Sequence, residues 1–192
     1  PLDISITTVM DALSHSLEAI WNKNANNTST DFAISAICSI LRNVEELKQT
    51  PLDLSIRNKL LNASTVSGLA FSNTTTAAAH SISYPLTINY GIPHGVASSI
   101  GLIPLLEING EFIKDPLNRI CNNLELTYDK LKQMIKTIPQ GVIPYTLDAW
   151  GIPEDQLPKL VDESFTKGRM NNNIVDLKTD DILMILKELY SN

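Results

Sequence analysis

Apolar residues near the start of the chain recur at three- and four-residue steps, which is the spacing of one buried face of an α-helix. These apolar positions are Val9, Met10, Leu13, Leu17, Ile20 and Trp21. Either Thr7 or Thr8 precedes them at a place suited to a helix cap. The pattern therefore predicts a first helix that begins close to these threonines.

The same periodicity continues after a polar loop over 23–30. It predicts a second helix over 30–47 and, after a turn at 51–53, a third helix through 56–69. The third helix carries a run of small side chains: Ala63, Ser64, Ser67, Gly68 and Ala70. Small residues let another backbone approach closely, so this helix is expected to be central and buried.

Two helices separated by a proline turn are predicted in the middle of the chain. A run of small residues over 73–84 favours a helix in which His80 lies near the end. Pro85 restricts Tyr84 and cannot continue the helical hydrogen bonds, so a break is expected there. A strongly apolar helix then covers 94–107, with Pro93 suited to its first turn.

Shorter helical patterns fill the remainder of the chain. They cover 116–126, 129–138, 144–150, 153–166 and 179–190. The sequence shows no sustained alternation of apolar and polar residues, and no Asn-Gly or Asp-Gly pair between two such runs, so it gives no signal for a β-hairpin. The pattern predicts an all-α, multi-helix domain over 1–192.

Composition narrows the class of protein. The chain has 192 residues, is 43% hydrophobic and carries a formal net charge of −6 without a cluster of Lys or Arg, which argues against nucleic acid as a partner. No apolar run is long enough to span a membrane and no leader peptide precedes the first helix, so a cytoplasmic location is expected. Cys38 and Cys121 stand alone among apolar residues and are expected to be small core residues.

The histidines are the main chemical signal. Three are present in the whole chain, and they fall in two short motifs with one aspartate. Asp11 and His15 are four residues apart, which places them on one face of the first helix. His80 and His94 bracket the second motif, and His94 lies at a predicted helix start, where the dipole disfavours a protonated ring. One carboxylate and three imidazoles suit a divalent transition metal such as Fe²⁺ or Zn²⁺.

Simpler interpretations exist for each residue alone. Asp11 and His15, followed by Glu18 and Asn22, could form an ordinary exposed polar stripe. His80 could be a core histidine with its hydrogen bonds satisfied, and His94 could be a helix cap. The metal hypothesis rests on the four occurring together.

Three segments resemble a known family. MDALSHSLEA, HSISYPLTINYGIPHGVASSI and the closing RMNNNIVDLKTDDILMILKELY are similar to motifs in the C-terminal helical half of the iron-containing (group III) alcohol dehydrogenases, within the dehydroquinate synthase-like superfamily. Carried over residue by residue, the resemblance implies metal ligands at Asp11, His15, His80 and His94. It also implies NAD(P) as cofactor, a small alcohol or aldehyde as substrate, and a homodimer or higher homo-oligomer.

The chain departs from that family's pattern in two ways. Many members have a histidine four residues after the third ligand, where this chain has Tyr84. Tyr84, a catalytic candidate, and Tyr90 are therefore expected to line the substrate pocket, although packing on a neighbouring helix is an equally good expectation. No glycine-rich phosphate loop is present, so the nucleotide-binding domain is expected to be absent and the chain alone inactive.

Other relatives and roles remain open at this point. The tyrosine form of the second motif is similar to the branch that includes phosphonoacetaldehyde reductases. A zinc-dependent glycerol dehydrogenase-like or dehydroquinate synthase-like enzyme would also use an acidic ligand and two histidines, but without the Asp11–His15 pair. An inactive helical oligomerisation fragment is the alternative outside enzymes.

Overall fold

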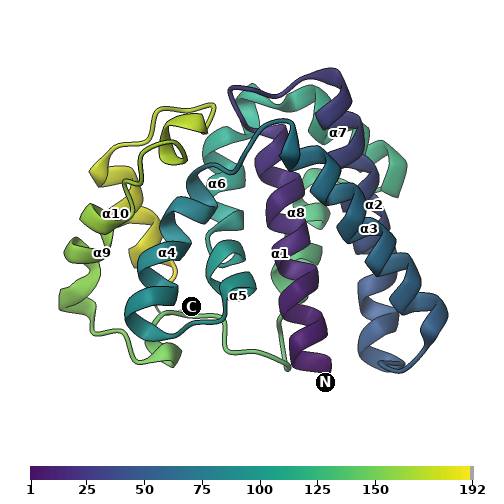
Figure 1. The fold of residues 1–192 in the computed structure, drawn as a ribbon, viewed down its shortest axis with the longest axis horizontal. Helices are drawn as coiled ribbons and strands as arrows, with labels where there is room; N and C mark the ends of the chain where they lie inside the picture. The colour runs from purple at the N-terminus through teal and green to yellow at the C-terminus, as the bar shows by residue number, and fades with distance from the viewer. Residues whose placement is uncertain (191–192) are drawn as a thin grey trace.

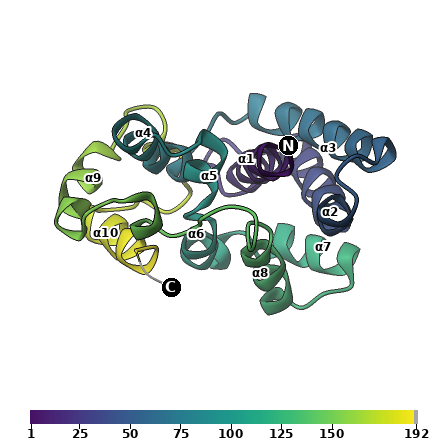
Figure 2. The ribbon, with the colours of Figure 1, turned by 90° about the horizontal axis from the view of Figure 1, so that it is seen from below.

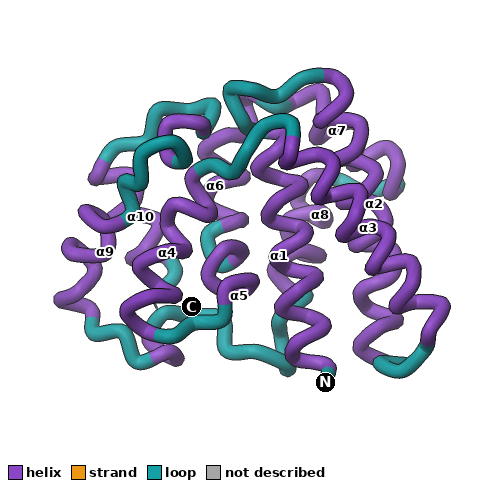
Figure 3. Tube along the Cα trace, viewed as in Figure 1, coloured by secondary structure: helices purple, strands orange, loops and turns teal. Residues whose placement is uncertain are grey.

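The computed structural model describes residues 1–190 as helices joined by turns and loops (Figure 3). The last two residues of the predicted 1–192 domain lie outside the described part. Within it, the all-α prediction is confirmed: no strand forms, and an isolated antiparallel bridge joins Asn22 and Asn173. The α-helices are α1 (Leu2–Ile20), α2 (Asn27–Gln49), α3 (Leu54–Ser72), α4 (Ala78–Tyr90), α5 (His94–Ser99), α6 (Leu102–Asn109), α7 (Lys114–Leu124), α8 (Tyr128–Thr137), α9 (Leu157–Glu163) and α10 (Thr179–Glu188).

Helix α1 lies at the centre of the arrangement (Figure 1). It packs against α2 and α3 on one side and against α4 and α5 on the other. Seen from below, α4, α5, α1 and α3 lie along one side of the molecule, and α10, α6, α8 and α7 lie along the other (Figure 2). This position explains why most residues of α1 from Ile6 to Ile20 are buried.

The core is built on the apolar stripe of α1. Ile6, Leu13 and Leu17 are fully buried, as is Trp21 just beyond the helix end. Burying each aliphatic side chain of this size contributes about 1.5–3 kcal/mol. The polar stripe of the same helix is partly buried at Asp11 and His15 and fully buried at Ser14 and Glu18, so these residues need partners inside the protein.

Two helices begin earlier than the threonine signals predicted. Helix α1 starts at Leu2, and the Thr8 hydroxyl donates to the carbonyl of Ile4 inside the helix instead of capping it. Helix α2 starts at Asn27 because Asn26 and Ser29 form a reciprocal capping box, each side chain accepting from the other's backbone N–H. The predicted starts at Thr7 or Thr8 and at residue 30 were wrong.

The predicted break at Pro85 was wrong as well. Helix α4 begins at Ala78, so His80 lies in its first turn, and the helix continues through Pro85 to Tyr90. An internal proline costs a helix about 3 kcal/mol. Burial of most of α4 against its neighbours outweighs this local penalty.

A different proline divides the predicted helix over 94–107. Pro104 cannot donate to the carbonyl of Ile100, and its ring crowds that carbonyl. The chain therefore turns at Ile100 and Gly101 between α5 and α6. This break allows the short helix α5 to lie beside α1.

The predicted role of α3 was also wrong, since it lies at the edge of the domain (Figure 2). Ala63, Ser67 and Ala70 are buried, but Leu61 is 65% exposed and Ser64 lies on the same open side. The buried small residues lie on the one face of α3 that packs closely against its neighbours, and they do not indicate a central helix.

The C-terminal third is less regular than its pattern predicted. The segment 144–150 forms turns and a single 3₁₀ turn, Asp148–Trp150, while 153–166 divides into Glu154–Gln156 and α9. Cys38 is buried as expected, whereas Cys121 is only partly buried.

No single described helix is long and apolar enough to cross a membrane. The pair His94–Phe112 and Lys114–Leu124 meets the length and composition requirement only together, and it is bent by 114°.

Candidate metal centre

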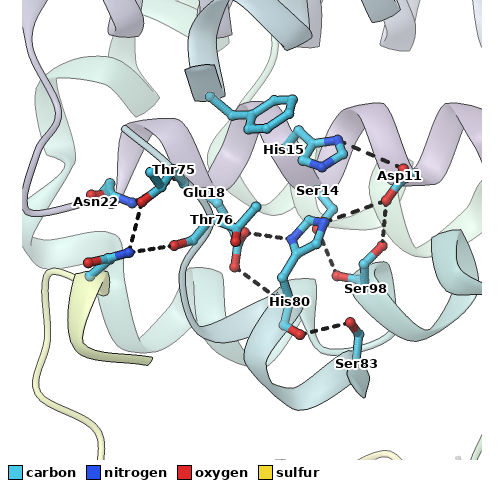
Figure 4. A network of polar contacts seen from close by, with 12 residues as sticks. Asp11, Ser14, His15, Glu18, Asn22, Thr75, Thr76, His80, Ser83 and Ser98 are labelled. Carbon is cyan, nitrogen blue, oxygen red and sulfur yellow. Dashed lines mark hydrogen bonds and ion pairs between the residues drawn. The ribbon is translucent and has the colours of Figure 1, made fainter. Parts of the chain in front are cut away.

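Three helices bring the four predicted ligands together, with the three histidines around the carboxylate of Asp11. Asp11 and His15 come from α1, His80 from the first turn of α4, and His94 from the first residue of α5. Asp11 Oδ1 lies 3.6 Å from His80 Nε2 and 3.6 Å from His94 Nε2, and Asp11 Oδ2 lies 3.9 Å from His15 Nδ1. Figure 4 shows the His15 and His80 rings beside Asp11.

The inner part of this cluster has the spacing of a metal site. Asp11, His15 and His80 each present one ligand atom within 4.8 Å of the others. His94 lies at the rim, with its side chain 45% exposed and its ring centroid 5.2 Å from that of His80. The four predicted residues therefore converge, with His80 buried, Asp11 and His15 partly buried, and His94 at the rim.

A glycine permits this convergence. A Cβ atom on Gly95 would lie 2.1 Å from the backbone oxygen of Thr7, so any larger residue would push α5 away from α1. Gly95 is buried at this contact. The close approach of the two backbones places the neighbouring His94 beside Asp11.

His80 is held from its far side by a buried glutamate. Glu18 Oε2 lies 2.6 Å from His80 Nδ1, and Glu18 Oε1 accepts the His80 backbone N–H at 3.1 Å (Figure 4). Glu18 is fully buried and His80 is 2% exposed. Glu18 and His80 therefore form a carboxylate–imidazole pair inside the core.

The other ring nitrogen of His80 has no hydrogen-bond partner. Nε2 is buried, and its 3.6 Å contact with Asp11 is longer than a hydrogen bond. A buried polar atom without a partner is unusual and needs an explanation. Its position among the ligand atoms of Asp11 and His15 fits a divalent ion bound there.

His15 is fixed by stacking instead. Its ring lies between that of Phe71 from α3, at a centroid distance of 4.2 Å, and that of His80, at 4.5 Å. Both pairs are close to parallel, at 16° and 24°. Aromatic contacts on both faces leave the ring edge, with its nitrogens, available to a ligand.

Asp11 is oriented by a hydroxyl near the end of the neighbouring helix α5. The Ser98 hydroxyl, on α5, donates to Asp11 Oδ1 at 2.9 Å, and the Ser14 hydroxyl donates to the carbonyl of Ser98 at 2.7 Å. These bonds connect α1 to α5 at the site itself.

The protein perturbs the proton affinities of three of these groups. Burial by itself raises the pKa of Asp11, but the imidazoles of His80 and His15 bring it below its usual value. Burial lowers the pKa of His15, and the Asp11 charge offsets part of this effect. Burial also lowers the pKa of His80, but the Asp11 and Glu18 carboxylates outweigh it and raise that pKa to about 9.

Tyr84 and Tyr90 lie in helix α4 and not in the predicted loop. Tyr84 is partly buried in a shallow pocket shared with Glu163 and Thr166, and the Arg169 guanidinium lies 4.6 Å from its ring centre. Tyr90 is partly buried and packs against the core. Their predicted contact with a substrate stays a prediction.

Sequence reasoning missed the residues that support the ligands. Glu18 and Asn22 continue the polar stripe of α1, but they are 0% and 1% exposed, so the exposed-stripe interpretation was wrong. The i, i+4, i+7 spacing of Asp11, His15 and Glu18 was a usable signal. Nothing in the local sequence pointed to Ser98 or Phe71, because their roles depend on how α5 and α3 pack on α1.

The fold and the cluster define an all-α domain with a carboxylate–imidazole centre suited to a divalent metal. The sequence model of the family described as "Fe-containing alcohol dehydrogenase family, C-terminal" matches residues 5–190. The chain therefore belongs to this family. The predicted resemblance is therefore confirmed.

Individual relatives agree with this membership. The chain is 29% identical to the long-chain-alcohol dehydrogenase 1 of Geobacillus thermodenitrificans over 88% of its length, and 28% identical to the 4-hydroxybutyrate dehydrogenase of Clostridium kluyveri over 99%. It covers 46% and 54% of those proteins. A solved sulfoacetaldehyde reductase from Bifidobacterium kashiwanohense, in complex with NAD+, superposes with a TM-score of 0.91 at 26% identity, covering 100% of this chain and 51% of that one. The chain thus spans about half the length of the relatives it matches.

Proposed function

We propose that Asp11, His15, His80 and His94 bind one divalent transition metal, Fe²⁺ or Zn²⁺, in an NAD(P)-dependent alcohol dehydrogenase or aldehyde reductase. The observation that carries this proposal is the buried His80 Nε2, which has no hydrogen-bond partner among the described residues and lies 3.6 Å from Asp11, beside a ligand atom of His15. Imidazole and carboxylate are suitable ligands for both ions. The family description, with its iron-containing members, supports the same choice.

A metal bound there would act as a Lewis acid on a carbonyl or alkoxide oxygen. The residues of this chain set the conditions for that chemistry. Three neutral imidazoles and one carboxylate leave a divalent site with a charge of about +1, which favours bound alkoxide over alcohol. His94 lies on the exposed rim, so the substrate is expected to enter from the side of α5.

The substrate class is proposed from the named activities of the relatives. Those activities concern alcohols, a hydroxy acid and an aldehyde, so a small alcohol or aldehyde is the proposed substrate. Tyr84 and Tyr90 remain the proposed pocket residues, about one and nearly three helical turns beyond His80 on α4. Since no glycine-rich phosphate loop occurs in this sequence, we propose that residues outside it hold most of the dinucleotide. A cytoplasmic homo-oligomer remains part of the proposal.

The metal proposal is tested by anaerobic calorimetric titration of Fe²⁺ or Zn²⁺ into the chelator-treated chain. Asp11→Asn keeps the size of the side chain but removes its charge, so it should bind the metal far more weakly than the unchanged chain. Asp31→Asn is the matched control, because Asp31 is an exposed aspartate paired with Arg119 on the surface. No uptake by the unchanged chain, or equal affinity in Asp11→Asn, would exclude this function for the site.

A further inference from the structure

We propose that Glu18 is a positioning residue for the metal site: its carboxylate accepts a hydrogen bond from the Nδ1–H of His80 and so directs the Nε2 lone pair of that ring to the metal. This inference rests on the proposed metal-binding function and adds a residue that does not contact the ion.

The contacts of Glu18 determine both the position and the rotation of the ring. One carboxylate oxygen accepts the His80 backbone N–H at 3.1 Å, and the other lies 2.6 Å from Nδ1. A carboxylate accepts at both oxygens and donates at neither. Nδ1 must therefore carry the proton, which leaves Nε2 as the nitrogen that faces Asp11.

The burial of this pair makes the constraint strong. Glu18 is 0% exposed and His80 is 2% exposed, so water does not compete for either contact. A carboxylate behind a metal-binding histidine is known to fix the tautomer and to raise the ligand's basicity. In the described part of the chain, the ring nitrogens of His15 and His94 form no hydrogen bond, so His80 alone is held in this way.

Glu18 also explains why helix α4 begins where it does. No side chain of its own caps the start of α4 at Ala77. The His80 N–H is in the first turn, where intrahelical acceptors are lacking, and Glu18 from α1 supplies one. A single carboxylate thereby fixes the helix start and the ring that projects from it.

Glu18→Gln tests this proposal with almost no change in size. The amide has one accepting oxygen for two donors. If that oxygen accepts the backbone N–H, the amide NH₂ faces Nδ1 and can only donate, which moves the ring proton to Nε2. If the amide turns over, the backbone N–H faces a donor and the helix start is disturbed.

The first measurement is a calorimetric Zn²⁺ titration of the unchanged chain, Glu18→Gln and Glu46→Gln. Glu46, an exposed residue of α2, provides the matched loss of one negative charge. Zinc affinity should fall about 10–100-fold in Glu18→Gln, as for other losses behind a metal ligand, and stay unchanged in Glu46→Gln. Equal zinc affinity in Glu18→Gln and the unchanged chain would overturn the positioning role but not the metal site. Absence of zinc uptake by the unchanged chain would overturn both.

The second measurement does not need Glu18→Gln to fold, because it reads the tautomer of His80 with Glu18 in place. The chain has three histidines, so a long-range ¹H–¹⁵N spectrum of the zinc-loaded protein contains three imidazole spin systems, which His15→Gln and His94→Gln assign. We expect the His80 system to show a proton on Nδ1, protected from exchange, and zinc on Nε2. Zinc on Nδ1 of His80, or a ring that exchanges between tautomers, would overturn the proposal.

Discussion

His80 and His94 approach the same oxygen of Asp11 at the same distance, 3.6 Å, from two regions of very different character. On the α4 side, His80 is buried and bound to Glu18, so fold and site share the same residues. On the α5 side, His94 is 45% exposed, and its position depends on the backbone contact of Gly95 with α1. The comparison predicts that His80 contributes to folding and to the proposed metal binding alike, whereas His94 contributes to the proposed metal binding alone.

The largest effect is expected for His80→Ala. The substitution leaves the Glu18 carboxylate buried without its partner, which costs about 3–5 kcal/mol when one member of a buried ion pair is removed. It also removes the proposed inner ligand. Urea unfolding in chelator should show the loss of stability, and a metal titration should show the loss of binding. Unchanged metal-free stability would mean that Glu18 and His80 are not coupled as the structure indicates.

A pH series should give opposite trends for the metal-free and metal-bound protein. The Asp11 and Glu18 carboxylates raise the pKa of His80 from 6.5 to about 9, despite burial. In the metal-free protein this stabilisation is complete below pH 6.5 and is lost as pH rises through about 9, an effect on the order of 3 kcal/mol. A metal must displace the Nε2 proton, so metal affinity should rise across the same window.

Thermal melting in chelator and metal titration at each pH measure these two trends. His94→Ala provides the comparison, because both trends should persist without the exposed imidazole. A metal affinity that stays flat over this range would show that His80 does not titrate as a ligand.

Gly95→Ala is expected to have the next largest effect. The added Cβ would lie 2.1 Å from the Thr7 oxygen, so α5 must move, at about 1–3 kcal/mol for such overpacking. Gly68→Ala is the matched control, since a Cβ there meets nothing within 4 Å and alanine favours a helix by about 0.5–1 kcal/mol. Denaturant unfolding of both variants tests the contact. Equal stability of Gly95→Ala and the unchanged chain would contradict the close approach of α5 to α1.

These contacts also show what the sequence could and could not predict. The periodic apolar stripe of α1 predicted a helix, and the histidine motifs predicted residues that do converge. The helix break predicted at Pro85 was wrong because burial of α4 outweighs the missing hydrogen bond. That burial depends on tertiary packing, which local sequence rules do not describe. The partners Phe71 and Ser98 come from α3 and α5, and their roles exist only once those helices pack on α1.

The smallest effect on folding is expected for His94→Ala. An exposed residue at a helix start contributes only about 1 kcal/mol or less to stability. Losing one ligand should nevertheless weaken metal binding by more than the roughly 10–100-fold of an indirect partner. Unfolding and metal titration of the same sample separate the two quantities. A collapse of metal-free stability, or an unchanged metal affinity, would show that His94 has a structural role instead.

The central claim, that these four side chains bind one metal ion, is tested most directly by diffraction. A crystal of the chain grown with Fe²⁺ under anaerobic conditions should give one anomalous peak at the iron edge, bounded by Asp11 and the three imidazoles, with His80 Nε2 in contact. An anomalous map without a peak among these residues, with iron elsewhere or none bound, would contradict the account.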